Sequence, residues 1–244
     1  MSAPPLRVLY EDEALVIVDK PPKTLVHRSA LSPGDYPLMW TLRDQLGCWV
    51  YPAHRLDRAT SGAIAFTKSP AHARALAASF ERREVEKRYW AVVRGYAPEE
   101  VDVCAPLLEP LDDLGDPLAD RGKGPQEARS SVRCLSRVEL PIPVGRYPTT
   151  RYSLVEAVPH TGRRHQLRRH LHHITHPVVG DTSYGRTEHN QLFRDRFGCD
   201  RLLLAAVSLV VPHPVTGARV AVAAPVTGVF EGVVRALFEG VMRP

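Results

Sequence analysis

Apolar and polar positions along this chain alternate in short blocks rather than in one sustained period. Two apolar runs, 8–10 and 15–18, flank an acidic Glu-Asp-Glu turn, which is typical of a β-hairpin. Pro21 and Pro22 end the second of these strands. Similar strand-like runs are predicted at 63–67, 89–93, 131–139, 150–157, 202–211 and 220–224.

Helical patterns are fewer, and we predict four helices. Ser69 and Pro70 give one helix an N-cap and a first residue, and its apolar stripe runs to about Arg83. The other three are predicted at 41–46, closed by Gly47, from a cap at Thr161 through Ile174, and at 230–238.

Two stretches show neither the strand-like nor the helical pattern of apolar residues. Residues 97–126 are rich in Pro, Gly and Asp and are expected to be a surface excursion with little regular structure, and 180–199 to be a loop. With no internal repeat and no obvious linker, the pattern predicts one α+β domain over 1–244 on a mostly antiparallel sheet.

Composition places the chain among ordinary globular proteins, with 44% hydrophobic and 24% charged residues. The longest apolar stretch, 202–212, is about half of what a membrane span requires. The N-terminus lacks the apolar core of a signal peptide, and the four cysteines are too widely spaced for a zinc or redox motif. We therefore expect a soluble cytoplasmic protein with reduced thiols, no membrane association and, by default, a monomer.

Charge is segregated along the chain, although the net charge is only +5. Residues 97–120 contain eight acidic side chains and no lysine or arginine, whereas 157–180 contain four arginines, six histidines and no acidic residue. The basic segment is suited to bind phosphates, and the acidic one to lie in solvent.

One nonapeptide, His54-Arg-Leu-Asp-Arg-Ala-Thr-Ser-Gly62, carries the strongest chemical signal. Asp57 lies between Arg55 and Arg58, whose positive charge favours an ionised carboxylate. Such a group suits a nucleophile or a base, although an aspartate in Thr-Ser-Gly turn chemistry can also be a simple turn cap.

Two further segments have both a chemical and a structural interpretation. Tyr89, in Glu-Lys-Arg-Tyr, is either a core aromatic of a strand or a ring on which a base stacks. Residues 162–170, Gly-Arg-Arg-His-Gln-Leu-Arg-Arg-His, have the pattern of a basic amphipathic helix. The structural interpretation of this helix is a surface that faces solvent or phosphates. His172 and His176 have a metal-like spacing, but they lack the accompanying Glu or Cys ligands, and Pro177 ends the helix.

Taken together, these segments resemble the RluA-type pseudouridine synthases, which isomerise uridine within RNA. The resemblance covers nearly the whole chain and implies a single catalytic domain, with flanking helices, a central RNA-binding cleft and no preceding S4 domain. It implies no cofactor and no metal, in agreement with the lack of a dinucleotide fingerprint or a P-loop in the sequence.

The resemblance also implies roles for individual residues. Asp57 matches the essential aspartate, Tyr89 the tyrosine that stacks beneath the flipped uracil, and Arg168 the arginine that pairs with that aspartate. Arg55 matches an arginine that helps to open the RNA. Leu167 is also expected among the RNA-binding residues; it directly precedes Arg168, so the helix turns it to a different face, where it can pack against the tyrosine. The remaining expected RNA contacts are Arg58, Arg163, Arg164 and Arg169.

Two segments, 40–46 and 145–152, resemble a tRNA-modifying branch of the family that acts on the uridine at position 65 in the T-stem. The expected partner is therefore tRNA. The alternatives are a synthase for ribosomal RNA or for a broader set of RNAs, a non-catalytic RNA-binding or RNA-folding protein, and a histidine-dependent metalloenzyme.

Overall fold

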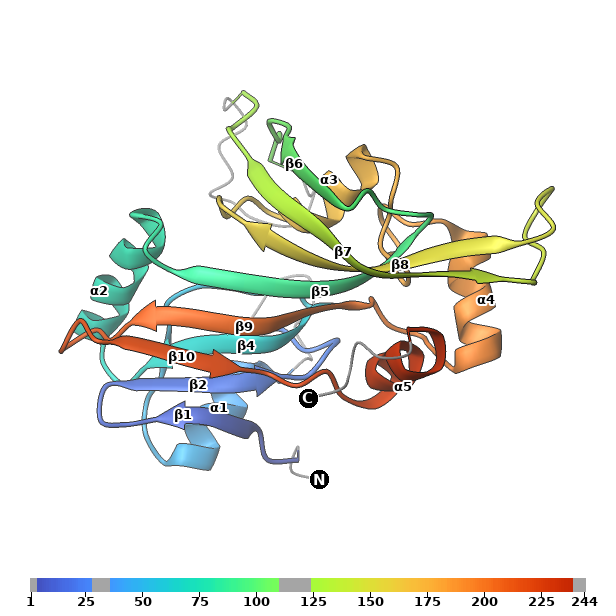
Figure 1. The fold of residues 1–244 in the computed structure, drawn as a ribbon. Coiled ribbons are helices and arrows are strands. Elements are labelled where there is room, and N and C mark those ends of the chain that lie inside the picture. The colour runs from blue at the N-terminus through green and yellow to red at the C-terminus, as the bar shows by residue number, and fades with distance from the viewer. Residues whose placement is uncertain (1–3, 28–35, 110–123, 239–244) are drawn as a thin grey trace. The chain divides into compact units, whose positions relative to one another are not determined.

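The computed structural model describes residues 4–27, 36–109 and 124–238, and these form an α+β structure (Figure 1). The predicted fold class is confirmed, and seven strand pairings among the described residues are antiparallel. The chain divides into two compact units, 1–87 with 108–124 and 206–225, and 88–107 with 125–205 and 226–244. That one catalytic domain spans 1–244 stays a prediction.

The first unit contains most of the N-terminal half. Its elements are β1 (Arg7–Glu11), β2 (Leu15–Lys20), α1 (Leu38–Leu46), β3 (Tyr51–Pro52), β4 (Ser61–Thr67), α2 (Pro70–Glu81), most of β9 (Leu204–Pro212) and β10 (Arg219–Ala223). β4 lies between β2 and β9, and every residue of it is buried. One face of these strands packs against Leu76 of α2 to form a hydrophobic core.

The predicted caps explain how the helices of this unit begin and end. The Ser69 hydroxyl accepts a hydrogen bond from the His72 amide at 3.1 Å, and Pro70 is the first helical residue, as expected. Gly47 closes α1 in the left-handed conformation. The β1–β2 turn is held by Asp12, whose Oδ1 accepts the amides of Ala14 and Leu15, both at 2.8 Å.

The second unit contains the remaining elements. These are most of β5 (Glu86–Arg94), β6 (Glu100–Cys104), β7 (Arg129–Leu140), β8 (Thr150–Pro159), α3 (Gln166–His173), α4 (Thr187–Phe197) and α5 (Gly228–Leu237). Its strands follow the order β5-β8-β7-β6. β7 and β8 form a long hairpin that pairs from Ser130 opposite Pro159 to Leu140 opposite Thr150, with a register shift between Cys134 and Ser136.

Three sequence predictions in this unit are wrong. The expected excursion contains β6, because Val101 and Val103 pair with β7 in spite of their acidic neighbours. The expected loop at 180–199 contains α4, which has only two buried residues and so shows little periodicity. α3 begins at Gln166 and Thr161 is not its cap, because His165 adopts a left-handed conformation with φ of +54°.

One prediction lies outside the described residues, namely the acidic centre of the excursion at 110–123. None of the four cysteines forms a disulfide in this structure. Within the described chain, no helix combines the length and the apolar character that crossing a bilayer requires.

Candidate active site

In the first unit, the buried side chain of Lys20 stabilises the loop that contains Asp57. The Lys20 ammonium donates hydrogen bonds to the carbonyls of Arg58 and Thr60 at 3.1 and 2.7 Å, and to that of Pro21 at 2.9 Å. The Thr60 amide donates to the Asp57 carbonyl at 3.1 Å, which closes the turn. Lys20, which the sequence analysis did not single out, thus fixes the backbone that presents Asp57.

The structure explains why the last residue of the nonapeptide, Gly62, is a glycine. Its φ of +109° disfavours a side chain, and a Cβ there would lie 2.2 Å from the carbonyl oxygen of Ala206 on β9. The glycine therefore allows β4 and β9 to approach each other directly after the Asp57 turn.

His54 at the start of the nonapeptide serves as an acceptor. Its Nε2 accepts the Ala65 amide at 3.0 Å, and its ring stacks on Phe80 with centroids 4.4 Å apart. Burial, together with the charge of nearby Lys87, lowers the pKa of His54 to about 3. The ring is therefore neutral at physiological pH and anchors the loop to β4.

In the second unit, the segment 162–170 is locked onto β7 by one buried amide. Gln166 Oε1 accepts the Thr161 hydroxyl at 2.7 Å and the Arg163 amide at 2.9 Å. Its Nε2 donates to the Arg129 carbonyl at 2.9 Å and to the Ser130 hydroxyl at 3.0 Å. Four bonds to one side chain fix the start of α3.

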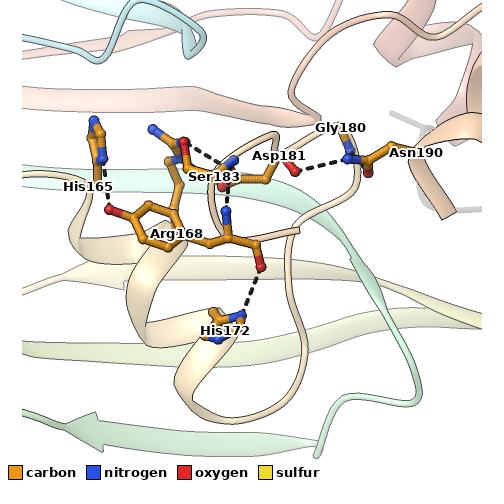
Figure 2. A network of polar contacts seen from close by, with 8 residues as sticks. His165, Arg168, His172, Gly180, Asp181, Ser183 and Asn190 are labelled. Carbon is orange, nitrogen blue, oxygen red and sulfur yellow. Dashed lines mark hydrogen bonds and ion pairs between the residues drawn. The ribbon is translucent and has the colours of Figure 1, made fainter. Parts of the chain in front are cut away.

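Arg168 of α3 forms a buried ion pair with Asp181 (Figure 2). Its Nε and Nη2 donate to the two carboxylate oxygens at 2.7 and 2.8 Å, and the two side chains are 7% and 0% exposed. Burial alone would raise the pKa of Asp181, but the hydrogen bonds and charge of Arg168 outweigh it, and the pKa is lowered. The pair therefore stays charged at neutral pH.

Asp181 is itself held in place by the residues around it. Its Oδ1 accepts the amides of Ser183 and Tyr184 at 2.9 and 3.0 Å. The side chain of Asn190 on α4 accepts a hydrogen bond from the Gly180 amide at 2.8 Å and donates one to the Asp181 carbonyl at 2.9 Å (Figure 2). The helix that the sequence analysis missed is thus part of the support of Arg168.

Tyr184 lies against the same guanidinium. The Arg168 Cζ is 5.1 Å from the centroid of its ring, and its hydroxyl is 3.1 Å from His165 Nδ1. The Tyr184 carbonyl accepts a hydrogen bond from His172 Nδ1 at 2.8 Å. Arg168 is therefore held both by a carboxylate and by an aromatic face, which fixes the plane of its guanidinium.

A pocket of about 490 Å³ opens beside α3 in this unit. Arg169, His172 and His173 line it, together with Tyr184 and the segment 104–107. Three nitrogen-bearing side chains around one hollow suit an anionic ligand such as a phosphate.

The predicted site residues fall into both units. Arg55, Asp57 and Arg58 belong to the first, and Tyr89, Arg163, Arg164, Leu167, Arg168 and Arg169 to the second. The predicted pairing of Arg168 with Asp57, and the contact of Leu167 with Tyr89, stay predictions, as does the RNA-binding cleft. Tyr89 lies on β5 opposite Ala157 and is partly exposed, and Leu167 is buried.

The histidines of the metal alternative bond to separate carbonyls. His172 Nδ1 bonds to the carbonyl of Tyr184, and His176 Nδ1 to that of Arg94 at 2.9 Å. Among the described residues, no three potential ligands come together around a metal position.

Comparison with known proteins identifies the class that this fold and these motifs define. Residues 14–173 match the RNA pseudouridylate synthase family, and this span contains Asp57, Tyr89 and Arg168. The chain belongs to the RNA pseudouridylate synthase family, and is therefore an isomerase. The resemblance to RluA-type enzymes is confirmed.

Particular relatives define the branch. The chain is 46% identical to tRNA pseudouridine synthase C of Pasteurella multocida, over 91% of each protein, and 46% identical to that of Vibrio cholerae, over 93% of each. It is 45% identical to the enzyme of the same name from Pectobacterium carotovorum. That match covers 94% of this chain but only 61% of the Pectobacterium protein.

Solved structures agree on the fold. Human RNA pseudouridylate synthase domain containing 1 superposes with a TM-score of 0.70 and 26% identity, over 91% of this chain and 83% of that one. Human RNA pseudouridylate synthase domain containing 4 shares the fold, with a TM-score of 0.71 at 22% identity, over 94% and 92%.

Proposed function

We propose that this protein converts one uridine of tRNA, at position 65 in the T-stem, to pseudouridine in the cytoplasm. The observation that carries the proposal is the identity of about 46% with enzymes named tRNA pseudouridine synthase C, over nine-tenths of the chain. The segments 40–46 and 145–152, which resemble that branch, support the same substrate.

The reaction requires no redox change and no transferred group. The N1–C1′ bond breaks, the uracil turns, and a C5–C1′ bond forms while the proton of C5 is lost and N1 gains one. Because reactant and product are isomers, no second substrate has to donate or accept a group or electrons. What it must supply is a positioned carboxylate, a support for the extruded base and contacts to phosphates.

Asp57 is the carboxylate of this proposal. An ionised Asp57 is needed whether it attacks C1′, attacks the base or removes a proton from C2′. The Lys20 ammonium beneath the loop and the close approach at Gly62 support a fixed position for this side chain. A preorganised charge of this kind costs no reorganisation during the reaction.

Arg168 is the positioning partner in this proposal. Asp181 engages its Nε–Nη2 edge, and a guanidinium presents a second edge that can engage another carboxylate. Held in this way, Arg168 orients Asp57 and keeps it ionised. Tyr89 then offers a ring face to the flipped uracil, and Arg55 fills the space that the base leaves.

The proposed RNA contacts come from the basic segment and from the Asp57 turn. Arg169 lines the pocket beside α3, Arg163 is exposed, and Arg58 lies in the Asp57 turn. Each phosphate contact releases counterions, so binding should weaken as the salt concentration rises.

Pseudouridine mapping at nucleotide resolution tests the substrate. Purified protein is incubated with unmodified total tRNA and with ribosomal RNA, without added metal or nucleotide, beside a sample heated before mixing. We expect signal at a single T-stem uridine of tRNA. Signal in ribosomal RNA alone would refute the substrate while retaining the chemistry, and no signal in either RNA would refute the catalytic assignment.

A further inference from the structure

The end of the β7–β8 hairpin is a tight turn that the active site does not use. Val144 and Tyr147 exchange two backbone hydrogen bonds of 3.1 and 3.3 Å. Gly145 has a φ of +59°, and Arg146 does not have a positive φ, which is the pattern of a type II′ turn. The turn places Arg146 and Tyr147 at the tip, and both are exposed. Figure 1 shows this yellow-green tip extending beyond β5 and β6 of the same unit.

The hairpin is stiff on both sides of its tip. Pro141, Pro143 and Pro148 restrict the backbone around the turn. At its base, the Gly95 amide donates to the Arg151 carbonyl at 2.7 Å, and the Tyr96 hydroxyl donates to Glu139 at 2.9 Å. A surface that is ordered before binding loses little entropy when it binds.

Two arginine–tyrosine pairs cover this end of the unit. The Arg146 Cζ lies 5.1 Å from the ring centroid of Tyr147, and Arg151 lies at the same distance from Tyr96. The tyrosines are large aromatic residues that remain 52% and 42% exposed. Exposed aromatic rings beside guanidinium groups are the chemistry by which proteins stack on bases and bind phosphates.

The local charge favours an anion. Arg94 is near enough to help Arg146 lower the pKa of Tyr147. Glu139, next to the end of β7, accepts hydrogen bonds from Thr149 and Tyr96 and pairs with Arg151 at 3.3 Å. Its charge is therefore balanced, and Arg94 and Arg146 leave the tip basic.

The tip is far from the catalytic motif within the same unit. β8 runs for ten residues from Thr150, beside the tip, to Pro159, just before the motif at 162–170. At about 3.4 Å per residue, this strand separates the two by about 30 Å. A ligand that reaches both must be a macromolecule, such as a folded RNA.

We propose that Tyr96, Arg146, Tyr147 and Arg151 form a second contact surface for the RNA substrate, remote from the target uridine. The surface binds phosphates through its arginines and stacks an unpaired or terminal base on a tyrosine ring. This inference rests on the proposed function, since it assumes that RNA is the substrate. It also gives the segment 145–152 a role in substrate selection.

Single-turnover kinetics on a full-length tRNA transcript test this surface. The double variant Arg146→Ala/Tyr147→Ala is compared with the wild type and with Arg235→Ala, an exposed arginine on α5 that removes charge elsewhere in the same unit. We expect the double variant to raise the Kd about tenfold and to leave the rate at saturating enzyme unchanged. Arg235→Ala should change the Kd less than twofold, and Tyr147→Phe, which keeps the ring, should retain most of the affinity.

A double variant that binds like Arg235→Ala would overturn the inference, as would an unchanged Kd with a lower saturating rate. If the double variant misfolds, the single Arg146→Ala variant gives the same comparison. A wild type that binds RNA but forms no pseudouridine would refute the proposed function, and the Kd series would still report on the surface.

Discussion

At the scale of single residues, the buried pair of Arg168 and Asp181 carries the largest energetic consequence. Asp181→Ala leaves a buried guanidinium without this partner and releases the amides of Ser183 and Tyr184. We expect it to lower the free energy of unfolding by about 3–5 kcal/mol, as measured by urea denaturation at pH 7. Asp195→Ala, an exposed carboxylate on α4, is the control and should change it by less than about 0.5 kcal/mol.

The same pair predicts a pH dependence. The pKa of Asp181 is lower in the folded protein than its ordinary value of 3.8. A lowered carboxyl pKa stabilises the folded state at pH values above the unfolded pKa, and that stabilisation is lost as the pH falls through the folded pKa. The difference between wild type and Asp181→Ala should therefore shrink as the pH drops below about 4. An equal difference at pH 7 and pH 3 would show that the pair is not the cause.

At the scale of elements, α3 depends on its attachment to β7. Gln166→Ala removes the four hydrogen bonds that hold the start of the helix and leaves the buried Ser130 and Thr161 hydroxyls with fewer partners. We expect a loss of about 2–3 kcal/mol in the free energy of unfolding. Gln191→Ala, at an exposed position on α4, is the matched control. Equal losses from the two variants would mean that Gln166 does not anchor α3.

Local signals explain which elements could be predicted from the sequence. Ser69 and Pro70 mark the start of α2 in the sequence, and the strands of the core have continuous apolar runs. α4 lacked such a signal because only Leu192 and Phe193 are buried in it. The two apolar residues of β6 could not be distinguished from loop residues without knowing that β7 would pair with them.

At the scale of the whole molecule, motifs identified the site chemistry, but the residues that support it were not predictable. Asp57, Tyr89 and Arg168 stand in recognisable strings. Lys20 and Asp181 act on residues 40 and 13 positions away, respectively, through contacts that only the folded chain creates. The sequence therefore specified candidate catalytic groups, whereas the structure shows what holds two of them in place.

The central claim is that Asp57 performs the isomerisation, and Asp57→Asn tests it most directly. This variant keeps the size of the side chain and removes its charge. Pseudouridine formation in a single tRNA transcript is measured under single-turnover conditions, with RNA affinity measured in parallel. We predict that conversion falls at least about a thousandfold, while the Kd for the transcript changes less than about threefold. Conversion within tenfold of the wild type, with unchanged binding, would contradict the assignment.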